Sequence, residues 1–128
     1  MVLDVESVEQ FDKILMDSGD VKHGKKYVVV DFYAKWCRPC VAFAPAYDEL
    51  SEEYGDQIYF LKINIDGNEE LSTRYEIRSL PTFMFFDVGN LVSEYETIIG
   101  ANKEKILQKL KYLDGKSTIA TNPESFDF

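Results

Sequence analysis

The segment "FYAKWCRPC", residues 32–40, holds both cysteines of this 128-residue chain, with two residues between them. Trp36, the only tryptophan, directly precedes Cys37, and Arg38 and Pro39 stand between Cys37 and Cys40. This spacing is compatible with a redox-active pair, with half of a metal site or with a structural crosslink. The sequence on either side of the segment distinguishes between these three roles.

The cysteine segment joins an expected strand to an expected helix. Residues 27–34, "YVVVDFYA", are almost all β-branched or aromatic, which is typical of a strand buried on both faces. Residues 40–55 have helical spacing, and Pro45 within them is expected to kink the helix. Cys37 therefore falls at the start of the helix, with Cys40 one turn further in, and unpaired N–H groups and the helix dipole favour an anion at the first turn. Because the thiolate is the reactive form of cysteine, this position favours a nucleophilic Cys37.

The other two roles lack support from the sequence. A zinc site needs four ligands, and besides the cysteines the chain has one histidine, His23, in a distant polar segment. A structural disulfide across two residues closes too small a loop to restrict the unfolded chain. In dithiol exchange, by contrast, Cys37 attacks a substrate disulfide and Cys40 displaces the resulting mixed disulfide. The sequence thus favours a redox pair and no metal.

The remaining segments alternate between strand and helix patterns. Further strands are expected at residues 1–5, 57–66, 82–87 and 91–99. Further helices are expected at residues 7–19, which begin with a capping box, at 68–77, and at 102–113, just before Gly115. The order predicts a three-layer α/β domain with a parallel core and an antiparallel hairpin around Gly89–Asn90. We predict one domain, residues 1–113, followed by a polar tail, residues 114–128.

Composition excludes several classes of protein. The net charge is −9 and no basic stripe is present, so nucleic acid is not expected as a partner. No apolar run reaches the roughly 20 residues of a membrane span, and no Gly-rich phosphate loop occurs. The N-terminal segment "MVLDVESVEQ" lacks the layout of a signal peptide. We therefore expect a cytoplasmic monomer, with an organelle left open if a presequence has been removed.

At this point the motifs match a known family. "VDFYAKWCRPC" resembles the active-site segment of the thioredoxin family, and "KINID", "IRSLPTFMFF" and "IIGANKEKILQKL" follow in the family's order and spacing. The resemblance covers roughly residues 4–113. It implies a thioredoxin fold, with a central mixed five-stranded sheet flanked by about four helices. It also implies a protein-disulfide reductase with a redox-active Cys37–Cys40 disulfide and no bound cofactor.

The resemblance further implies partners. Thioredoxin reductase would recycle the disulfide, so NADPH and FAD would belong to that partner, and peroxiredoxin-like and reductase-like proteins would be among the substrates. Two other functions stay open at this point. One is a thiol oxidant or disulfide isomerase of an oxidising compartment, and the other is a non-catalytic binding subunit of a larger assembly.

Individual roles carry over by position. Cys37 resembles the family's exposed nucleophile and Cys40 its buried resolving thiol. Pro81 resembles the cis-proline that faces the cysteines, although by itself it would pass for an ordinary proline at a strand entry. Asp31 resembles a carboxylate beneath Cys40 that relays its proton; the alternative is a strand-end aspartate that reaches solvent. Lys62 resembles a lysine that can pair with Asp31; the alternative is a solvated strand residue.

The expected substrate surface is a rim of apolar and small residues around the cysteines. It consists of Trp36, Pro39, Ile65, Leu80, Pro81, Ile99, Gly100 and Ala101, together with Arg38. Arg38 departs from the family's commonest motif, which has glycine at this position. A guanidinium beside Cys37 favours the thiolate, so Arg38 is expected either to make the disulfide a stronger oxidant or to select partners.

Overall fold

The computed structural model describes residues 1–16 and 25–120, and His23 lies outside these ranges. The apolar run after residue 26 forms the central strand β2 (Tyr27–Tyr33), whose first six residues are buried. Strand β2 pairs in parallel with β3 (Ile58–Asn64) and antiparallel with β4 (Thr82–Asp87). The edges are β1 (Val2–Val5), parallel to β3, and β5 (Ile98–Ile99), antiparallel to β4. The sheet is therefore mixed and five-stranded, in the order β1-β3-β2-β4-β5.

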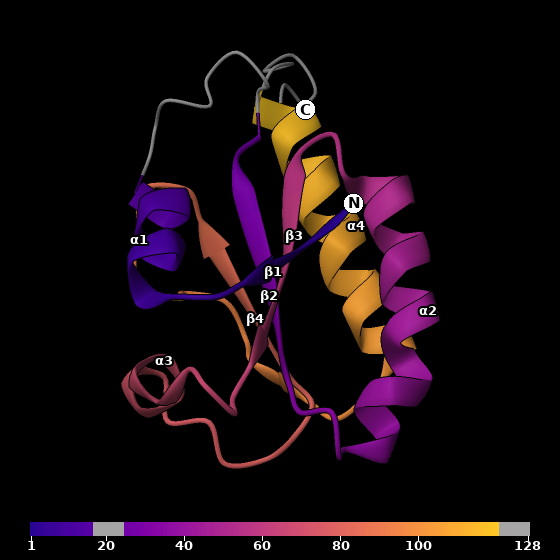
Figure 1. Cartoon of the computed structure of the whole chain (residues 1–128). Coiled ribbons are helices and arrows are strands. Elements are labelled where there is room, and N and C mark those ends of the chain that lie inside the picture. The colour runs from indigo at the N-terminus through magenta and orange to yellow at the C-terminus, as the bar shows by residue number, and fades with distance from the viewer. Residues whose placement is uncertain (17–24, 121–128) are drawn as a thin grey trace.

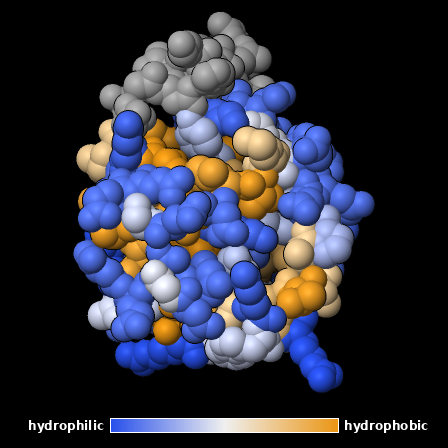
Figure 2. Space-filling model, viewed as in Figure 1, coloured by the Kyte–Doolittle hydropathy of each residue, from blue (hydrophilic) through white to orange (hydrophobic). Residues whose placement is uncertain are grey.

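Helices cover both faces of the sheet (Figure 1). Helices α2 (Arg38–Tyr54) and α4 (Lys103–Ala120) pack on one face, where Phe43 and Ile106 meet Val29 and Phe83. Helices α1 (Val8–Met16) and α3 (Glu69–Arg74) pack on the other, where Phe11 meets Val28. The predicted three-layer α/β fold and its order of elements are confirmed. On the molecular face in Figure 2 hydrophilic residues prevail, in keeping with the net charge of −9.

Strand β4 runs antiparallel to β2 because the preceding connection stays at one end of the sheet. Helix α3 has six residues and is about 9 Å long, whereas a seven-residue strand spans about 23 Å. Thr82, at the start of β4, pairs with Phe32, near the end of β2, so the connection comes back to the end of the sheet that it left. Residues 65–81 therefore remain beside the C-terminal ends of β2 and β3, close to the cysteines.

The expected hairpin strand at residues 91–99 is wrong in its extent, since β5 contains only Ile98 and Ile99. Side chains of this segment bond to β4, and one of them occupies a backbone carbonyl that a longer strand could have used. The Ser93 hydroxyl donates to the Phe85 carbonyl at 2.5 Å, and the Tyr95 hydroxyl donates to Asp87 at 2.6 Å. Residues 88–97 consequently form a loop over the edge of β4.

The expected helix end at residue 113 is also wrong, because α4 continues to Ala120. Gly115 does not adopt the left-handed conformation with which glycine commonly ends a helix. Beyond it, the Lys116 ammonium donates to the Tyr95 hydroxyl at 3.1 Å, which connects the additional residues to the loop after β4. Within residues 1–16 and 25–120, no helix is long and apolar enough to cross a membrane.

At the start of α1, the expected cap is present in part. The Ser7 hydroxyl accepts the Gln10 N–H at 3.1 Å, as a capping box requires. The Gln10 side chain, however, accepts from the N–H of Glu6 at 2.8 Å and not from that of Ser7. The helix begins where the sequence predicts, and residues 17–19 of the expected helix lie outside the described residues.

Candidate active site

The two cysteines form a disulfide at the N-terminus of α2, with a Cα–Cα distance of 5.3 Å. Cys37 is the N-cap residue, with φ −85° and ψ 109°, and its Sγ accepts the N–H of Cys40 at 3.3 Å. Pro39 occupies the first turn, where a missing N–H leaves no helical hydrogen bond unmade. Sγ of Cys37 thus lies where the free backbone donors of the helix point.

The two sulfurs face different spaces. Cys37 lines an open groove of about 540 Å³, called here the outer groove, together with Trp36, Arg38 and Leu80. Cys40 lines a smaller space of about 160 Å³, called here the inner cavity, together with Asp31. No side chain lines both. The disulfide therefore lies between the outer groove and the inner cavity, which extends from buried Asp31 to the exposed Lys35, Val41 and Asp48.

The exposed areas of the cysteines differ less than expected. Cys37 is 6% exposed and Cys40 4%, so Cys37 is not an exposed residue in the disulfide form. The reason is packing: both cysteines cluster with Ala34, and Ile65 and Leu80 pack against them. The two residues are distinguished by the space that each faces and not by exposed fraction.

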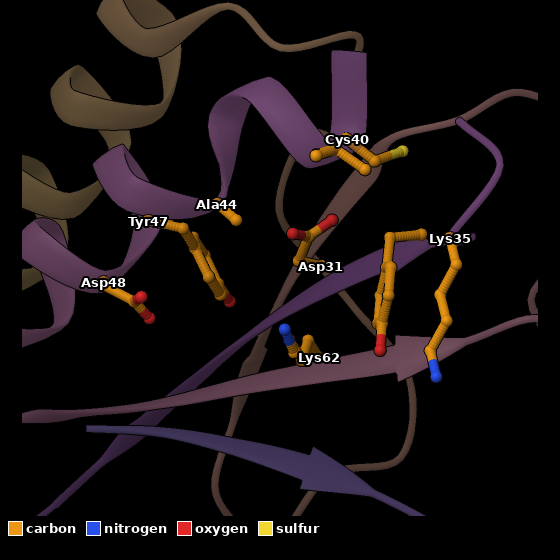
Figure 3. A pocket seen from close by; sticks show the side chains of 9 residues that line it. Asp31, Lys35, Cys40, Ala44, Tyr47, Asp48 and Lys62 are labelled. Atoms are coloured by element: carbon orange, nitrogen blue, oxygen red, sulfur yellow. The ribbon is translucent and has the colours of Figure 1, made fainter. Parts of the chain in front are cut away.

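The inner cavity brings Asp31, Lys62 and Tyr47 together beneath Cys40 (Figure 3). Asp31 is 4% exposed, and its Oδ1 has no hydrogen-bond partner among the described residues. Burial raises the pKa of Asp31 to about 7, while the positive charge of Lys62 acts in the opposite direction. The alternative of a strand-end aspartate in solvent is therefore wrong. This carboxyl group therefore keeps its proton to a higher pH than an ordinary aspartate.

Lys62 lies opposite Asp31 in the register of β3 and β2. Its ammonium is 4.9 Å from the centre of the Tyr33 ring, a cation–π distance. The Tyr33 hydroxyl donates to a carboxylate oxygen of Asp4 at 3.3 Å. Burial, followed by the nearby Asp4, raises the pKa of Tyr33 to about 12. Lys62 is half-buried, and its ammonium lies over an aromatic ring on the strand that carries Asp31.

Tyr47 closes the inner cavity from α2. Its hydroxyl group donates toward the carbonyls of Leu61 at 2.7 Å and Val29 at 3.2 Å, and burial raises its pKa well above the usual value. The sequence predicted Tyr47 as a core residue, which it is, but missed its place in the site. Tyr33 was also missed as a site residue, although its position two residues after Asp31 on the same strand was a usable signal.

The outer groove contains most of the expected substrate surface. Trp36, Arg38, Pro39, Ile65 and Leu80 line it with Cys37, and Ile77 and Arg78, which the sequence did not single out, complete it. Trp36 is 68% exposed, and its indole N–H donates to Asp66 at 2.9 Å. The Leu80–Pro81 bond is cis, as the resemblance implies.

Ile99, Gly100 and Ala101 lie beside this groove without lining it. The N–H of Gly100 donates to the carbonyl of Pro81 at 2.8 Å, and Ile99 pairs with Thr82. Gly100 has a φ of +95°, a backbone conformation that favours glycine. No group of His, Cys, Asp and Glu side chains that could hold a metal ion occurs within residues 1–16 and 25–120.

A family model for thioredoxin matches residues 3–112. The chain belongs to the thioredoxin family. Thioredoxin of Homo sapiens is 41% identical over 106 residues, which cover 83% of this chain and 92% of the human protein. Thioredoxin of Geodia cydonium is 38% identical over 87% of this chain and 97% of its own length. Thioredoxin-T of Drosophila melanogaster is 39% identical, and this chain spans 66% of it.

Solved structures of the family have the same fold. The thioredoxin of Malassezia sympodialis (Mala s 13) has a TM-score of 0.75 at 30% identity, with 89% of this chain and 91% of that chain covered. Thioredoxin h of poplar has a TM-score of 0.75 at 35% identity, with 88% and 95% covered. The chain is therefore a protein-disulfide oxidoreductase with a redox-active cysteine pair, and thioredoxins carry no bound cofactor.

Proposed function

We propose that this thioredoxin reduces protein disulfides with Cys37 as nucleophile and Cys40 as resolving thiol, and that a thioredoxin reductase recycles it with electrons from NADPH. The observation that carries the proposal is the division of the disulfide between two spaces. Cys37, at the helix N-cap, borders the outer groove, whereas Cys40 borders the inner cavity that holds Asp31. This arrangement suits attack by one sulfur and proton transfer at the other.

In the first step, the Cys37 thiolate attacks one sulfur of the substrate disulfide. A bond forms between Sγ of Cys37 and that sulfur, the substrate S–S bond breaks, and the second substrate sulfur leaves as a thiolate that takes a proton from solvent. Backbone donors at the N-terminus of α2 favour the attacking thiolate.

In the second step, the Cys40 thiol transfers its proton to the Asp31 carboxylate, and Sγ of Cys40 attacks Sγ of Cys37. The mixed disulfide breaks, and the remaining substrate sulfur leaves as a thiolate and is protonated. In total, two electrons and two protons pass to the substrate, and the Cys37–Cys40 disulfide forms. A carboxyl group with a pKa of about 7 can accept and release a proton near neutral pH, and Lys62 limits how far that pKa rises.

Substrate recognition is assigned to the outer groove and its border. Trp36, Pro39, Ile65 and Leu80 offer apolar contacts, and the backbone beside Pro81 offers main-chain hydrogen bonds to an extended segment. Ile99, Gly100 and Ala101, next to Pro81, extend this surface. Recognition through main-chain groups tolerates many sequences, which suits a reductase of several proteins.

Membership of the thioredoxin family supports a proposal for the partners and the compartment. A yeast thioredoxin-like structure, 25% identical with a TM-score of 0.69, was described for thiol resolution in a mitochondrial 1-Cys peroxiredoxin via glutathione/thioredoxin systems. We include peroxiredoxins and other disulfide-containing proteins among the substrates, and assign the protein to the cytoplasm as a monomer.

The test is disulfide reduction coupled to a thioredoxin reductase and NADPH. Wild type should turn over, Cys37→Ser should be inactive, and Cys40→Ser should accumulate mixed disulfides that identify the substrates. Full turnover by Cys37→Ser would contradict the mechanism. A reduction potential far more positive than about −270 mV would favour an oxidant over a reductase.

A further inference from the structure

The outer groove has a charge opposite to that of the chain as a whole. The chain has a net charge of −9, yet the charged side chains that line the groove among the described residues are two arginines, Arg38 and Arg78. They come from separate segments, the first turn of α2 and the loop before β4. Ile65 and Leu80 contribute apolar side chains to the same groove, and Cys37 lines it as well.

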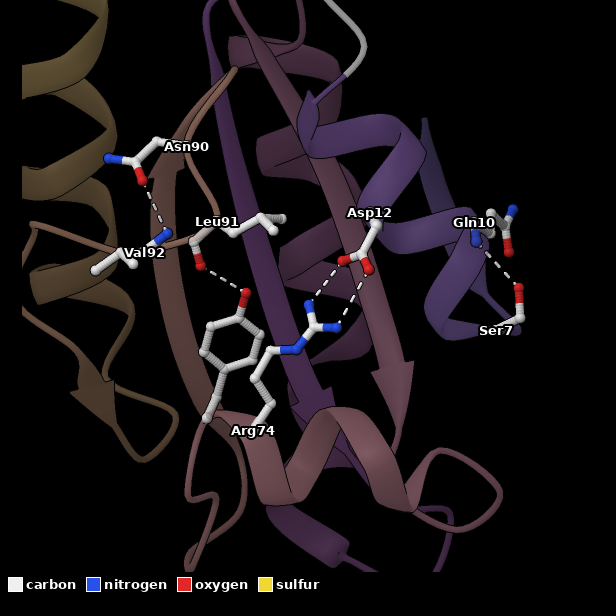
Figure 4. A network of polar contacts seen from close by, with 8 residues as sticks. Ser7, Gln10, Asp12, Arg74, Asn90, Leu91 and Val92 are labelled. Atoms are coloured by element: carbon white, nitrogen blue, oxygen red, sulfur yellow. Dashed lines mark hydrogen bonds and ion pairs between the residues drawn. The ribbon is translucent and has the colours of Figure 1, made fainter.

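The residues that lead into the Arg78 loop are bonded to α1 and to the loop after β4. Arg74 donates two hydrogen bonds to Asp12 of α1, at 2.6 and 3.2 Å, and the Tyr75 hydroxyl donates to the Leu91 carbonyl at 2.7 Å (Figure 4). Just after helix α3, the N–H of Ile77 donates to the carbonyl of Ser72 at 2.9 Å. These bonds tie the start of the Arg78 loop to α1 and to the loop after β4.

The nearby carboxylates leave both arginines available. Glu76 lies 3.4 Å from Arg78, but the two side chains are 77% and 81% exposed, and a pair so exposed is weak. Asp66 accepts the indole N–H of Trp36 and does not line the groove. Among the residues that the structure describes, Glu76 is therefore the carboxylate with which a substrate carboxylate would compete, and it is loosely held.

We propose that the outer groove selects substrate disulfides flanked by acidic residues, with Arg38 and Arg78 as the specificity-determining residues. The occupant is an extended acidic segment of a protein substrate, whose cysteine meets Cys37 while neighbouring carboxylates meet the guanidinium groups. The inference rests on the proposed function and names its substrate class. It also gives Arg38 a role in partner selection, which glycine at the same position would not have.

The test uses three peptides that contain the same internal disulfide flanked by glutamate, glutamine or lysine. The pre-reduced full-length protein is mixed with each peptide, and the second-order rate constant is divided by that for dithiothreitol, which corrects for intrinsic reactivity. The rate should be highest for the glutamate peptide and lowest for the lysine peptide, and the preference should weaken as salt is raised. Arg38→Gln and Arg78→Gln should each lower the glutamate-to-glutamine ratio by about 1.5- to 5-fold.

Two further variants sharpen the result. Glu76→Gln, which removes the competing carboxylate, should raise the ratio, and Lys111→Gln, an equal charge change on the exposed face of α4 outside the groove, should not alter it. A wild-type ratio of one, or an unchanged ratio in the Arg38→Gln/Arg78→Gln double variant, would overturn the proposal. So would faster reduction of glutathione disulfide than of the glutamate peptide, because the groove would then serve a small anionic molecule. Failure to reduce any of the disulfides would instead contradict the proposed function.

Discussion

Asp31 shows most directly how a single residue couples stability to chemistry in this protein. A carboxyl group in the middle of the central strand is buried, and its Oδ1 has no hydrogen-bond partner among the described residues. Such a group is costly to ionise, and the cost appears as a raised pKa. The same property that makes Asp31 a suitable proton acceptor therefore makes the folded protein less stable when Asp31 is charged.

The first prediction concerns Asp31→Asn. The pKa of Asp31 is raised from 3.8 to about 7 on folding, so the folded state binds more protons than the unfolded state between these values. The resulting stability is complete below about pH 4 and is lost as pH rises to about 7. We expect wild type and Asp31→Asn to differ little at pH 4, and the variant to be more stable at pH 8 by up to about 4 kcal/mol. Urea unfolding of the oxidised proteins at both pH values measures this.

The control for that comparison is Glu104→Gln, which removes an exposed carboxylate of α4 and should give no such pH-dependent difference. An Asp31→Asn effect of equal size at pH 4 and pH 8 would mean that ionisation of Asp31 is not its cause.

The second prediction concerns Arg38→Gly, which removes the cation next to Cys37. The Cys37 thiol of the variant should have a higher pKa, and its disulfide a more negative reduction potential, by up to roughly 20 mV for an exposed charge pair. The pH dependence of alkylation and equilibration with glutathione measure the two quantities. Arg38→Lys, which keeps the charge, should stay close to wild type. If neither quantity changed in Arg38→Gly, tuning by Arg38 would be wrong and selection of substrates would be its remaining role.

The sequence was most informative where the charge of a residue differs from the character of the residues around it. Asp31 in an apolar strand and Arg38 between two cysteines stand out for that reason, and the cis bond before Pro81 was inferred from the family pattern. Arg78 and Tyr47 did not stand out, because an arginine in a polar loop and a tyrosine on an apolar helix face are ordinary. Their importance comes from the groove and the cavity, which exist only once distant segments are packed together.

At the scale of elements, α2 links the chemistry to the core. Its first turn presents Cys37 and Cys40, and two turns later the Tyr47 hydroxyl bonds to carbonyls of β2 and β3. These bonds set the position of the helix relative to the two strands that carry Asp31 and Lys62. The position of Cys40 relative to Asp31 therefore depends on the hydrogen bonds of the Tyr47 hydroxyl.

The third prediction follows from that contact. Tyr47→Phe keeps the ring and its packing but removes a buried hydroxyl and its hydrogen bonds, which should lower the free energy of unfolding by about 1–2 kcal/mol. Urea unfolding measures the loss. Tyr112→Phe removes a hydroxyl from a side chain that is 58% exposed and should cost much less. Equal losses in the two variants would contradict a positioning role for the Tyr47 hydroxyl.

The order of the elements could be predicted from hydrophobic periodicity, because each strand and helix has a local pattern. Their limits could not all be predicted. Strand β5 is short because the Ser93 and Tyr95 side chains bond to β4, and α4 is long because Gly115 stays helical and Lys116 reaches Tyr95. In both cases a contact between segments far apart in the sequence overrides the local signal.

For the whole molecule, the fourth prediction concerns the residue at which the folded domain ends. A chain that ends at residue 120 should melt at the temperature of the full chain, since the residues removed follow the last residue of α4 and the helix would stay intact. A chain that ends at residue 113 loses the Lys116–Tyr95 contact and should melt a few degrees lower, as befits a surface contact of about 1 kcal/mol or less. Thermal unfolding followed by circular dichroism compares the three. Identical midpoints would place the end of the domain at residue 113.

The separation of the outer groove from the inner cavity has a consequence for how the protein can change. Because no side chain lines both spaces, substitutions that redirect substrate choice need not disturb proton transfer, and the reverse also holds. Effects of changes in the two spaces should multiply rather than interact, as expected for sites without shared partners. Apart from Arg38, whose charge also acts on Cys37, groove residues can change one at a time and alter substrate choice while proton transfer at Asp31 stays intact. A protein engineer can use the same independence.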